Sequence, residues 1–410
     1  MASLGRTFRL LRLLPAELQT SHVKPALNLR APISSRSFST EELPDGTFKA
    51  SDLEVTLTPP HKLQAKPDVG NLIFGRTFTD HMFTVEWDKK TQWGNPQIKP
   101  MGNLPIHPAA KVLHYAIELF EGMKAYRGVD GRIRLFRPDL NMKRLLRGAR
   151  RAMLPTFDPN EFIGCIKKIV KLEQEWIPHS ETSSLYIRPT FIGTDPSLGV
   201  ALSNNAMLYV ILCPVGPYFA TGFKPVSLYA DPQYVRAWPG GCGDQKLGSN
   251  YGPTVFVQKT AEARGQQQVL WLYGEDHQLT EVGTMNIFFV VKNDNGEREL
   301  ITPPLNGLIL PGVTRFSVLD LCREWKELKI TERTITMKEV KQLVKENRLL
   351  EMFGAGTACI VCPVSSITYL GEKIEIPTAE QENPVYMKVL NTLSDIYYGK
   401  LNHPWGVLVD

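Results

Sequence analysis

The chain has 410 residues, of which 43% are hydrophobic and 22% are charged. This composition is typical of a folded globular protein with room for two domains, and no apolar run reaches the roughly 18 residues that a membrane span needs. The formal net charge is +5, but residues 1–40 alone contain six basic residues and one acidic residue. The rest of the chain is therefore neutral, and the basic balance does not indicate a nucleic-acid-binding protein.

Residues 1–40 have the arginine-rich, serine-rich composition of a mitochondrial transit peptide. On a helix, Leu4 and Leu11 share one face, while Arg6 and Arg9 share the opposite face. A disordered basic tail is the alternative. We expect a protein of the mitochondrial matrix whose fold begins after this segment.

Residues 41–215 are predicted to form a small α/β domain. It begins with loops and short strands, including an extended segment at 82–87. A helix that ends at Gly122 is predicted by an apolar stripe at 112–120, and Asp130-Gly131 predicts a hairpin turn. The remaining elements are two helices capped by Asp139 and Asp158, at 139–153 and 158–176, and strands at 185–190 and 206–213.

Residues 226–410 are predicted to form a second domain after a linker at 216–225. Strands are expected at 269–272 and 287–291, the latter turning at Asn295-Gly296. Helices are expected at 252–263, 313–326, 337–346 and 385–398. The mixture indicates two α/β or α+β domains with a ligand between them.

One lysine is distinguished by its surroundings. Lys246 lies in residues 242–251 (CGDQKLGSNY), among glycines and close to Tyr251. Such a lysine is a candidate amine nucleophile that forms a Schiff base with a carbonyl compound; a loop with a surface charge is the alternative. Upstream, Arg144 is a candidate phosphate ligand, or a solvated charge on a helix.

Three downstream segments bear on Lys246. Glu281 precedes an apolar strand, so we expect it to be partly buried beside a cation, although a turn acid held by backbone amides fits the same pattern. Residues 310–315 (LPGVTR) open a helix whose free amides can bind phosphate, or they simply start a helix. The small residues of 353–362 (FGAGTACIVC) let backbone amides approach a ligand carboxylate.

The joint order of these segments resembles the class IV aminotransferases, which are fold-type IV enzymes that use pyridoxal 5'-phosphate (PLP), and among them the branched-chain amino acid aminotransferases. The resemblance covers essentially residues 50–410 and implies a smaller N-terminal α/β domain and a C-terminal pseudo-barrel domain with PLP between them. It is carried by Gln245, Lys246, Asn250, Tyr251, Glu281, Thr284, Asn286, Phe288, Gly312, Val313, Thr314, Arg315, Gly356, Thr357 and Ala358, and by segments at 74–82, 115–125 and 186–189.

The resemblance implies a role for each cofactor-binding residue. Lys246 would form the Schiff base with PLP and then move the substrate proton. Glu281 would keep the pyridine nitrogen protonated, and Tyr251 would bind the phenolic oxygen. The other implied cofactor ligands, most of them to the phosphate, are Arg144, Thr284, Val313, Thr314 and Thr357. The family often has valine where this chain has Thr314, so the backbone amide is the implied contact there.

The implied reaction is reversible, ping-pong transamination of leucine, isoleucine and valine with 2-oxoglutarate. The amides of Thr357 and Ala358 would bind the substrate α-carboxylate, and Arg188 would pair with the γ-carboxylate of glutamate. The aliphatic side chain would lie among Phe74, Tyr115, Phe120, Tyr186 and Leu198. In this family Tyr115 and Leu198 come from the partner subunit, which implies a homodimer. Ordinary core packing is the alternative for the aromatic residues.

The six cysteines include one CxxC pair, Cys359 and Cys362. A zinc site would need a second pair of ligands, and none is visible, so no metal is expected. The resemblance implies a redox switch at these two cysteines, and two small residues on a buried strand are the alternative.

Two other functions remain compatible with the sequence. Another class IV enzyme, such as a D-amino acid aminotransferase or a chorismate-derived lyase, would keep Lys246 and Glu281 but change the pocket. A non-catalytic mitochondrial protein would use the CxxC pair for redox sensing or partner binding and would need neither PLP nor Lys246.

Overall fold

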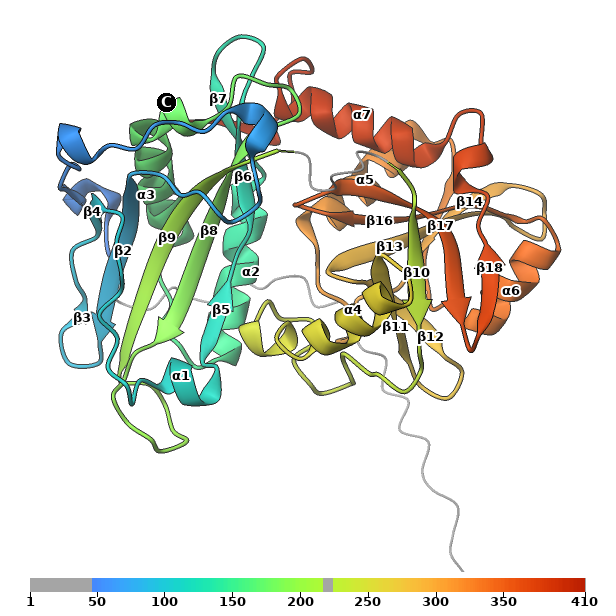
Figure 1. The fold of residues 1–410 in the computed structure, drawn as a ribbon, viewed down its shortest axis with the longest axis horizontal. Helices are drawn as coiled ribbons and strands as arrows, with labels where there is room; N and C mark the ends of the chain where they lie inside the picture. Colours follow the sequence, from blue (N-terminus) through green and yellow to red (C-terminus); the bar gives the residue numbers. More distant parts are fainter. Residues whose placement is uncertain (1–45, 217–223, 410) are drawn as a thin grey trace, which may run out of the picture. The chain divides into compact units, whose positions relative to one another are not determined.

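The computed structural model of the protein describes residues 46–216 and 224–409 (Figure 1). The predicted transit peptide at 1–40 and most of the predicted linker lie outside the described residues. The predicted boundaries between the two domains therefore stay a prediction.

The first sheet is built mostly from strands that precede residue 216. Its order is β1-β4-β2-β9-β8-β6-β7-β19, with β3 paired to β2 and β5 paired to β8. The strands are β1 (Glu54–Val55), β2 (His81–Asp88), β3 (Gln92–Trp93), β4 (Gln97–Pro100), β5 (Glu118–Phe120), β6 (Met123–Arg127), β7 (Ile133–Phe136), β8 (Ser184–Gly193), β9 (Asn205–Val215) and β19 (Gly406–Leu408).

The second sheet closes on itself. Its strands pair around a ring that runs β10-β11-β12-β13-β16-β17 and returns to β10, while β14, β15 and β18 extend it. Closure removes exposed edges and confirms the predicted barrel-like sheet. The strands are β10 (Val226–Ala230), β11 (Gln268–Tyr273), β12 (Gln278–Val282), β13 (Met285–Lys292), β14 (Arg298–Thr302), β15 (Lys329–Glu332), β16 (Leu349–Gly356), β17 (Ile360–Tyr369) and β18 (Glu372–Glu375).

Helices cover both sheets. The α-helices are α1 (Lys111–Tyr115), α2 (Pro138–Arg151), α3 (Pro159–Leu172), α4 (Thr254–Ala263), α5 (Val313–Trp325), α6 (Met337–Lys345) and α7 (Val385–Tyr397). Short 3-10 helices lie at Ala50–Asp52, Pro60–Lys62, Val69–Asn71, Gln174–Trp176, Gly248–Asn250 and Thr378–Glu380. Helices α2 and α3 lie beside the first sheet, and α5, α6 and α7 lie beside the second (Figure 1). The fold class is mixed α/β, as predicted.

The alternation of side chains along β13 divides the second half into two cores. Ile287 and Phe289 face the barrel core, whereas Phe288 and Val290 face the core under α5 and α7. Because successive side chains of a strand point to opposite faces, a continuous apolar strand can serve both cores. This explains why residues 287–291 contain no polar residue.

Most predicted elements are confirmed. The hairpin of β6 and β7 turns at Asp130-Gly131, where Gly131 has φ +75°, a conformation that glycine adopts without strain. Asp158 caps α3 by accepting a hydrogen bond from the amide of Asn160 at 2.8 Å. Helices α4, α5, α6 and α7 and strands β8, β9, β11 and β13 lie within a few residues of the predicted bounds.

The predicted helix through residues 112–120 is wrong. Helix α1 ends at Tyr115, and Ala116 has φ 49°, in the left-handed region. The chain then forms β5, which pairs with β8. Short apolar runs do not distinguish a helix from a buried strand by periodicity alone, and here pairing in the sheet outweighs the helical pattern.

The predicted cap at Asp139 is also wrong. Helix α2 begins at Pro138, and its N-cap residue is Arg137, without a side-chain capping bond. Asp139 instead forms a surface ion pair with Lys143, 3.4 Å away. Proline is favoured in the first turn of a helix because it has no amide proton to leave unpaired, and the N-cap lies two residues earlier than predicted.

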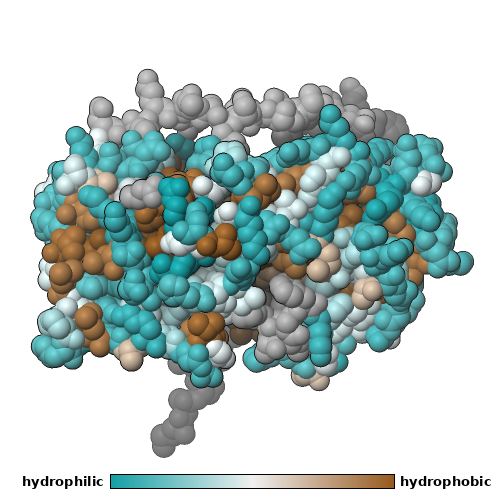
Figure 2. All heavy atoms as spheres, turned by 90° about the horizontal axis from the view of Figure 1, so that it is seen from above, coloured by the Kyte–Doolittle hydropathy of each residue, from teal (hydrophilic) through white to brown (hydrophobic). Residues whose placement is uncertain are grey.

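On the face drawn in Figure 2, hydrophobic residues lie in small groups between hydrophilic ones. No helix of the described residues is long and apolar enough to cross a membrane.

Candidate active site

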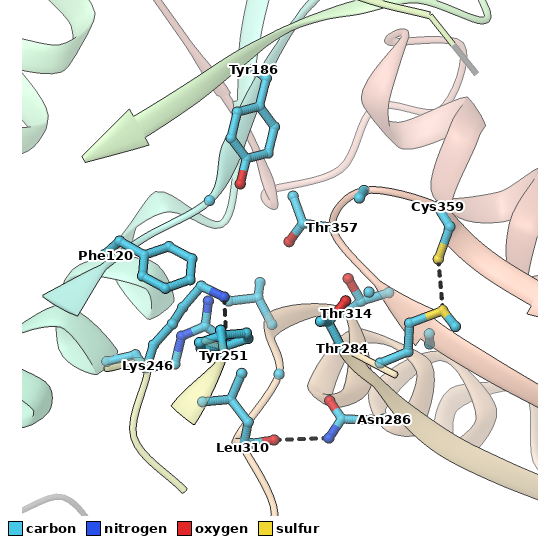
Figure 3. A pocket seen from close by; sticks show the side chains of 18 of the residues that line it. Phe120, Tyr186, Lys246, Tyr251, Thr284, Asn286, Leu310, Thr314, Thr357 and Cys359 are labelled. Atoms are coloured by element: carbon cyan, nitrogen blue, oxygen red, sulfur yellow. Dashed lines mark hydrogen bonds between the residues drawn. The ribbon is translucent and has the colours of Figure 1, made fainter. Parts of the chain in front are cut away.

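A cavity of about 250 Å³ is lined by residues of both sheets. Most of the predicted site residues line it: Phe74, Phe120, Arg144, Tyr186, Arg188, Lys246, Tyr251, Thr284, Val313, Thr314, Thr357, Ala358 and Cys359. Tyr115, Leu198, Glu281 and Cys362 are not among its lining residues. The fold thus brings residues that are more than 250 positions apart in sequence around one cavity (Figure 3).

The loop that carries Lys246 is fixed by its own side chains and by β5. The amide of Phe120 donates to the carbonyl of Lys246 at 3.1 Å. The side chain of Asn250 donates to the carbonyls of Cys242 and Gln245, at 2.7 and 2.9 Å. The glycine-rich loop is therefore held in one conformation, and Lys246 does not belong to a free surface loop.

The amine of Lys246 points into the cavity beside two aromatic rings (Figure 3). Its Nζ lies 3.4 Å from the hydroxyl of Tyr251 and 4.4 Å from the centre of the Phe120 ring. Burial, followed by the charges of Arg144 and Arg188, lowers the pKa of Lys246 to about 7. A large fraction of this amine is neutral at pH 7, which an amine nucleophile requires.

Glu281 lies in β12, almost fully buried, and has the cationic partner that its burial predicts. Arg236 approaches it at 2.9 Å, and the amide of Leu310 donates to its other oxygen at 2.8 Å. Burial raises the pKa of Glu281, while Arg236 opposes that shift. The carboxylate is oriented near the cavity floor, close enough to Lys246 to affect the pKa of its amine.

Arg144 lies on α2 and lines the cavity, but Glu121 holds its guanidinium. Its Nε and Nη2 each donate to one carboxylate oxygen of Glu121 at 2.7 Å, and its Nη1 donates to the carbonyl of Pro311 at 3.2 Å. Glu121 has no exposed surface. The alternative interpretation of Arg144 as a solvated helix charge is wrong, because the ion pair is buried.

The N-terminus of α5 opens onto the cavity. Its N-cap is Gly312, without a side-chain capping bond, and Val313 and Thr314 follow. A Cβ on Gly312 would lie 2.1 Å from Oδ1 of Asn286, so any larger residue there would have to displace the Asn286 side chain. Asn286 in turn donates to the carbonyl of Leu310 at 2.9 Å. The first amides of the helix have no side-chain partner from the described residues at the cavity, and such free amides can bind an anion.

The turn between β16 and β17, residues 357–359, forms another wall. Thr357 and Ala358 line the cavity, and the hydroxyl of Thr357 points toward it (Figure 3). Ile360, which ends the turn, has φ 64°. A β-branched residue in the left-handed region is strained, so the turn is held in shape by its surroundings.

An arginine and three aromatic residues form the remaining wall. Arg188 donates to the hydroxyl of Tyr186 at 3.0 Å and stacks on Phe120, 4.7 Å from the ring centre. Phe74 meets Tyr186 edge to face at 4.9 Å. Among the described residues, Nε of Arg188 is buried without a hydrogen-bond partner, which leaves a donor for an anionic ligand.

Tyr115 and Leu198 lie together outside this cavity. The hydroxyl of Tyr115 donates to the carbonyl of Leu198, and both residues are exposed, Leu198 by 62%. The fold therefore does not bring them to the site of their own chain.

Both cysteines of the CxxC pair are buried. The thiol of Cys359 contacts the sulfur of Met285 at 3.1 Å (Figure 3). Burial raises the pKa of Cys359 to about 12 and raises that of Cys362 as well. Within the part of the chain that the structure describes, no group of three or more His, Cys, Asp or Glu side chains is placed to hold a metal ion.

Sequence reasoning assigned no role to Glu121, which pairs with Arg144, or to Arg236, which pairs with Glu281. Glu121 lies in the segment 115–125, which carries part of the resemblance and was assigned to a helix, and Arg236 lies upstream of the Lys246 loop. The available signal was the requirement that a buried Glu281 or Arg144 must have an opposite charge nearby.

A family model described as amino-transferase class IV matches residues 118–367. The chain is 57% identical to the cytosolic branched-chain-amino-acid aminotransferase of Mus musculus, over 88% of this chain and 93% of that protein. It is 54% identical to the mitochondrial branched-chain-amino-acid aminotransferase of Mus musculus, over 87% of this chain and 91% of that protein.

Solved structures share the fold. A branched-chain amino acid aminotransferase from Escherichia coli superposes with a TM-score of 0.62 at 22% identity, over 80% of this chain and 98% of that one. The PLP form of the enzyme from Thermobaculum terrenum superposes with a TM-score of 0.65 at 18% identity, over 82% of this chain and 100% of that one.

Proposed function

The chain belongs to the class IV aminotransferases, and we propose that it transfers the amino group of leucine, isoleucine or valine reversibly to 2-oxoglutarate, with PLP as its cofactor. The observation that carries this proposal is a lysine amine with a lowered pKa in a cavity that also has an uncapped helix N-terminus. Relatives that are 57% and 54% identical carry the branched-chain name, which supports the substrate class.

The residues of the cavity fit PLP. The amides of Val313 and Thr314 and the guanidinium of Arg144 would hold the phosphate, since the uncapped N-terminus of α5 and Arg144 line the same cavity. Tyr251 and Glu281 would hold the phenolic oxygen and the ring nitrogen. Thr284 and Thr357 would complete the contacts.

When bound, PLP supplies an aldehyde for the amine of Lys246 and a protonated ring that accepts negative charge from the substrate Cα. Lys246 then moves the proton that Cα loses, because its Nζ has a pKa of about 7 and gives up or takes a proton readily at neutral pH. Glu281 would support the protonated ring by its own negative charge, and Arg236, 2.9 Å away, favours the ionised form of that carboxylate.

The substrate is held by groups of both halves. The amides of Thr357 and Ala358 would bind its α-carboxylate, while Phe74, Phe120 and Tyr186 would surround an aliphatic side chain. Arg188 has an unused Nε donor, which would bind the γ-carboxylate of glutamate. One cavity then accepts the two substrates in turn, as a ping-pong reaction requires.

A homodimer would complete the pocket. Tyr115 and Leu198 would reach the site of the partner subunit, and their exposed position supports this arrangement. Apolar residues around them are also exposed: Leu113 by 59%, Val200 by 85% and Leu202 by 54%. Such a group of exposed apolar residues is typical of a protein interface.

We also propose that the protein is mitochondrial. The arginine-rich composition of residues 1–40 and the mitochondrial relatives support this location. Fusion of residues 1–45 to a fluorescent protein, with Arg6, Arg9 and Arg12 replaced by glutamine as a control, tests it by microscopy.

The reaction is tested with purified protein, leucine and 2-oxoglutarate. We expect glutamate to form, and borohydride to attach bound PLP permanently to the protein. Lys246→Ala should abolish both, whereas Lys259→Ala, an exposed lysine of α4, should retain both. Appreciable turnover by the Lys246 variant would contradict the mechanism.

A further inference from the structure

A buried lysine outside the cavity is joined to the turn that would bind the substrate carboxylate. Lys124 lies in β6, with 7% of its surface exposed. Its Nζ donates to the carbonyl of Ala358 at 2.9 Å, across 234 residues of sequence. Lys124 does not line the substrate cavity, so this bond reaches the turn from its far side.

The turn has open space on both sides. Ala358 and Cys359 line the substrate cavity and also a second cavity of about 290 Å³, which Lys124 lines as well. A wall between two cavities has few packing contacts to hold it. The hydrogen bond from Lys124 therefore contributes more to the position of this turn than it would in a packed core.

The turn also requires restraint because its backbone is strained. Ile360 adopts φ 64° immediately after Cys359, and strained backbone persists only where the surrounding structure holds it. Burial lowers the pKa of Lys124 to about 8, so most of the amine is charged at pH 7. A charged donor forms a stronger bond to a carbonyl than a neutral one does.

We propose that Lys124 is a positioning residue, which anchors the turn at the carbonyl of Ala358 so that the preceding amides, those of Thr357 and Ala358, face the substrate α-carboxylate. With its carbonyl drawn toward Lys124, Ala358 does not present an oxygen to that carboxylate, and the repulsion between the two is avoided. This inference rests on the proposed function, because the carboxylate belongs to the amino acid or oxo acid substrate.

The experiment compares the PLP-bound enzyme with its Lys124→Met, Lys124→Arg and Lys224→Met variants. Steady-state kinetics give KM and kcat for leucine and for 2-oxoglutarate, and the dissociation constant of 4-methylvalerate reports carboxylate binding without chemistry. Lys224 is exposed and lines the same second cavity, so its variant controls for loss of charge there.

For Lys124→Met we expect KM of both substrates and the dissociation constant to rise about tenfold, as loss of one charge-assisted hydrogen bond predicts. The cofactor absorbance should stay unchanged and kcat should change less than about threefold. Lys124→Arg keeps a charged donor and should recover most of the affinity. Lys224→Met should match the parent enzyme.

Two failures are distinguishable. A parent enzyme without turnover contradicts the proposed function, whereas an active parent with the same KM as Lys124→Met contradicts the role of Lys124 alone. Equal effects in Lys124→Met and Lys224→Met would also overturn it. If Lys124→Met is insoluble, Lys124→Gln replaces it, because glutamine keeps a polar side chain but loses the charge and the reach.

Discussion

Glu121 and Arg144 form a two-pronged ion pair in which both carboxylate oxygens accept hydrogen bonds of 2.7 Å. The pair lies between β5 and α2, and neither residue is more than 8% exposed. Asn141 also donates to Glu121, at 2.8 Å. Arg144 is consequently oriented before any phosphate binds, which reduces the entropy that binding costs.

We predict that Glu121→Gln weakens both stability and PLP binding. Removal of one partner leaves the other charge buried and unpaired, which costs about 3–5 kcal/mol. Urea unfolding of the protein without PLP and titration with PLP measure the two effects. As a control, Asp139→Asn breaks an exposed ion pair on α2, the helix that carries Arg144. It should change the free energy of unfolding by less than about 1 kcal/mol. Similar losses in both variants would contradict the prediction.

We predict that Glu281→Gln lowers kcat by about a hundredfold, the size expected when one electrostatic contact to the reacting group is lost. KM should change little, because Glu281 would contact the ring nitrogen of PLP and not the substrate. Steady-state kinetics separate the two constants. Glu299→Gln, a buried glutamate of β14 outside the cavity, is the control and should retain normal kcat.

The lowered pKa of Lys246 predicts how the PLP-free protein reacts with PLP. The rate should rise with pH through a midpoint near 7, because only the neutral amine attacks an aldehyde and the pKa is about 7. Absorbance changes between pH 5.5 and 9 measure it, with free Nα-acetyl-lysine, whose pKa is about 10.4, as the control. A midpoint close to that of the control would exclude the lowered pKa.

The same shift affects folding stability. Below pH 7 the amine is protonated in both states, and its burial destabilises the fold. Between pH 7 and 10.5 the unfolded chain binds a proton that the folded one does not, so this contribution to the free energy of unfolding increases with pH. Lys246→Met should remove that increase in urea titrations at pH 6 and pH 9.

The redox role of the CxxC pair stays a prediction, and the buried position of the two thiols indicates that their oxidation is slow. Because the thiols are buried and their pKa values are raised, few thiolates are present to react with peroxide. We expect slow inactivation at pH 7 that is absent in Cys359→Ala. Activity measured over time in peroxide, with Cys165→Ala as a control, decides the matter; equal loss in all three proteins would remove the switch.

The sequence predicts the members of the site better than their partners. Lys246, Tyr251 and Thr357 were found because small residues and an apolar strand surround them in a recognisable order. Glu121 and Arg236 were not, because a residue that neutralises a buried charge carries no local pattern. The same reason applies to Lys124, whose bond to Ala358 depends only on how the two sheets are packed.

Local patterns also failed where tertiary pairing decides the conformation. The spacing of Leu119 and Phe120 fits a helix. They form β5 instead, because residues 190–192 of β8 pair with it and because the carbonyl of Lys246 accepts a hydrogen bond from the amide of Phe120. The pairing of β19 with β7 is likewise invisible to any window of sequence, since about 270 residues separate the two strands.

That last pairing gives the molecule an order of assembly. Strand β7 belongs to the first sheet, but its outer edge is covered by β19, which a ribosome makes only after the whole barrel. During synthesis this edge is open, and an open edge invites pairing with other chains. Until the barrel has been made, the first sheet therefore lacks the strand that covers the edge of β7.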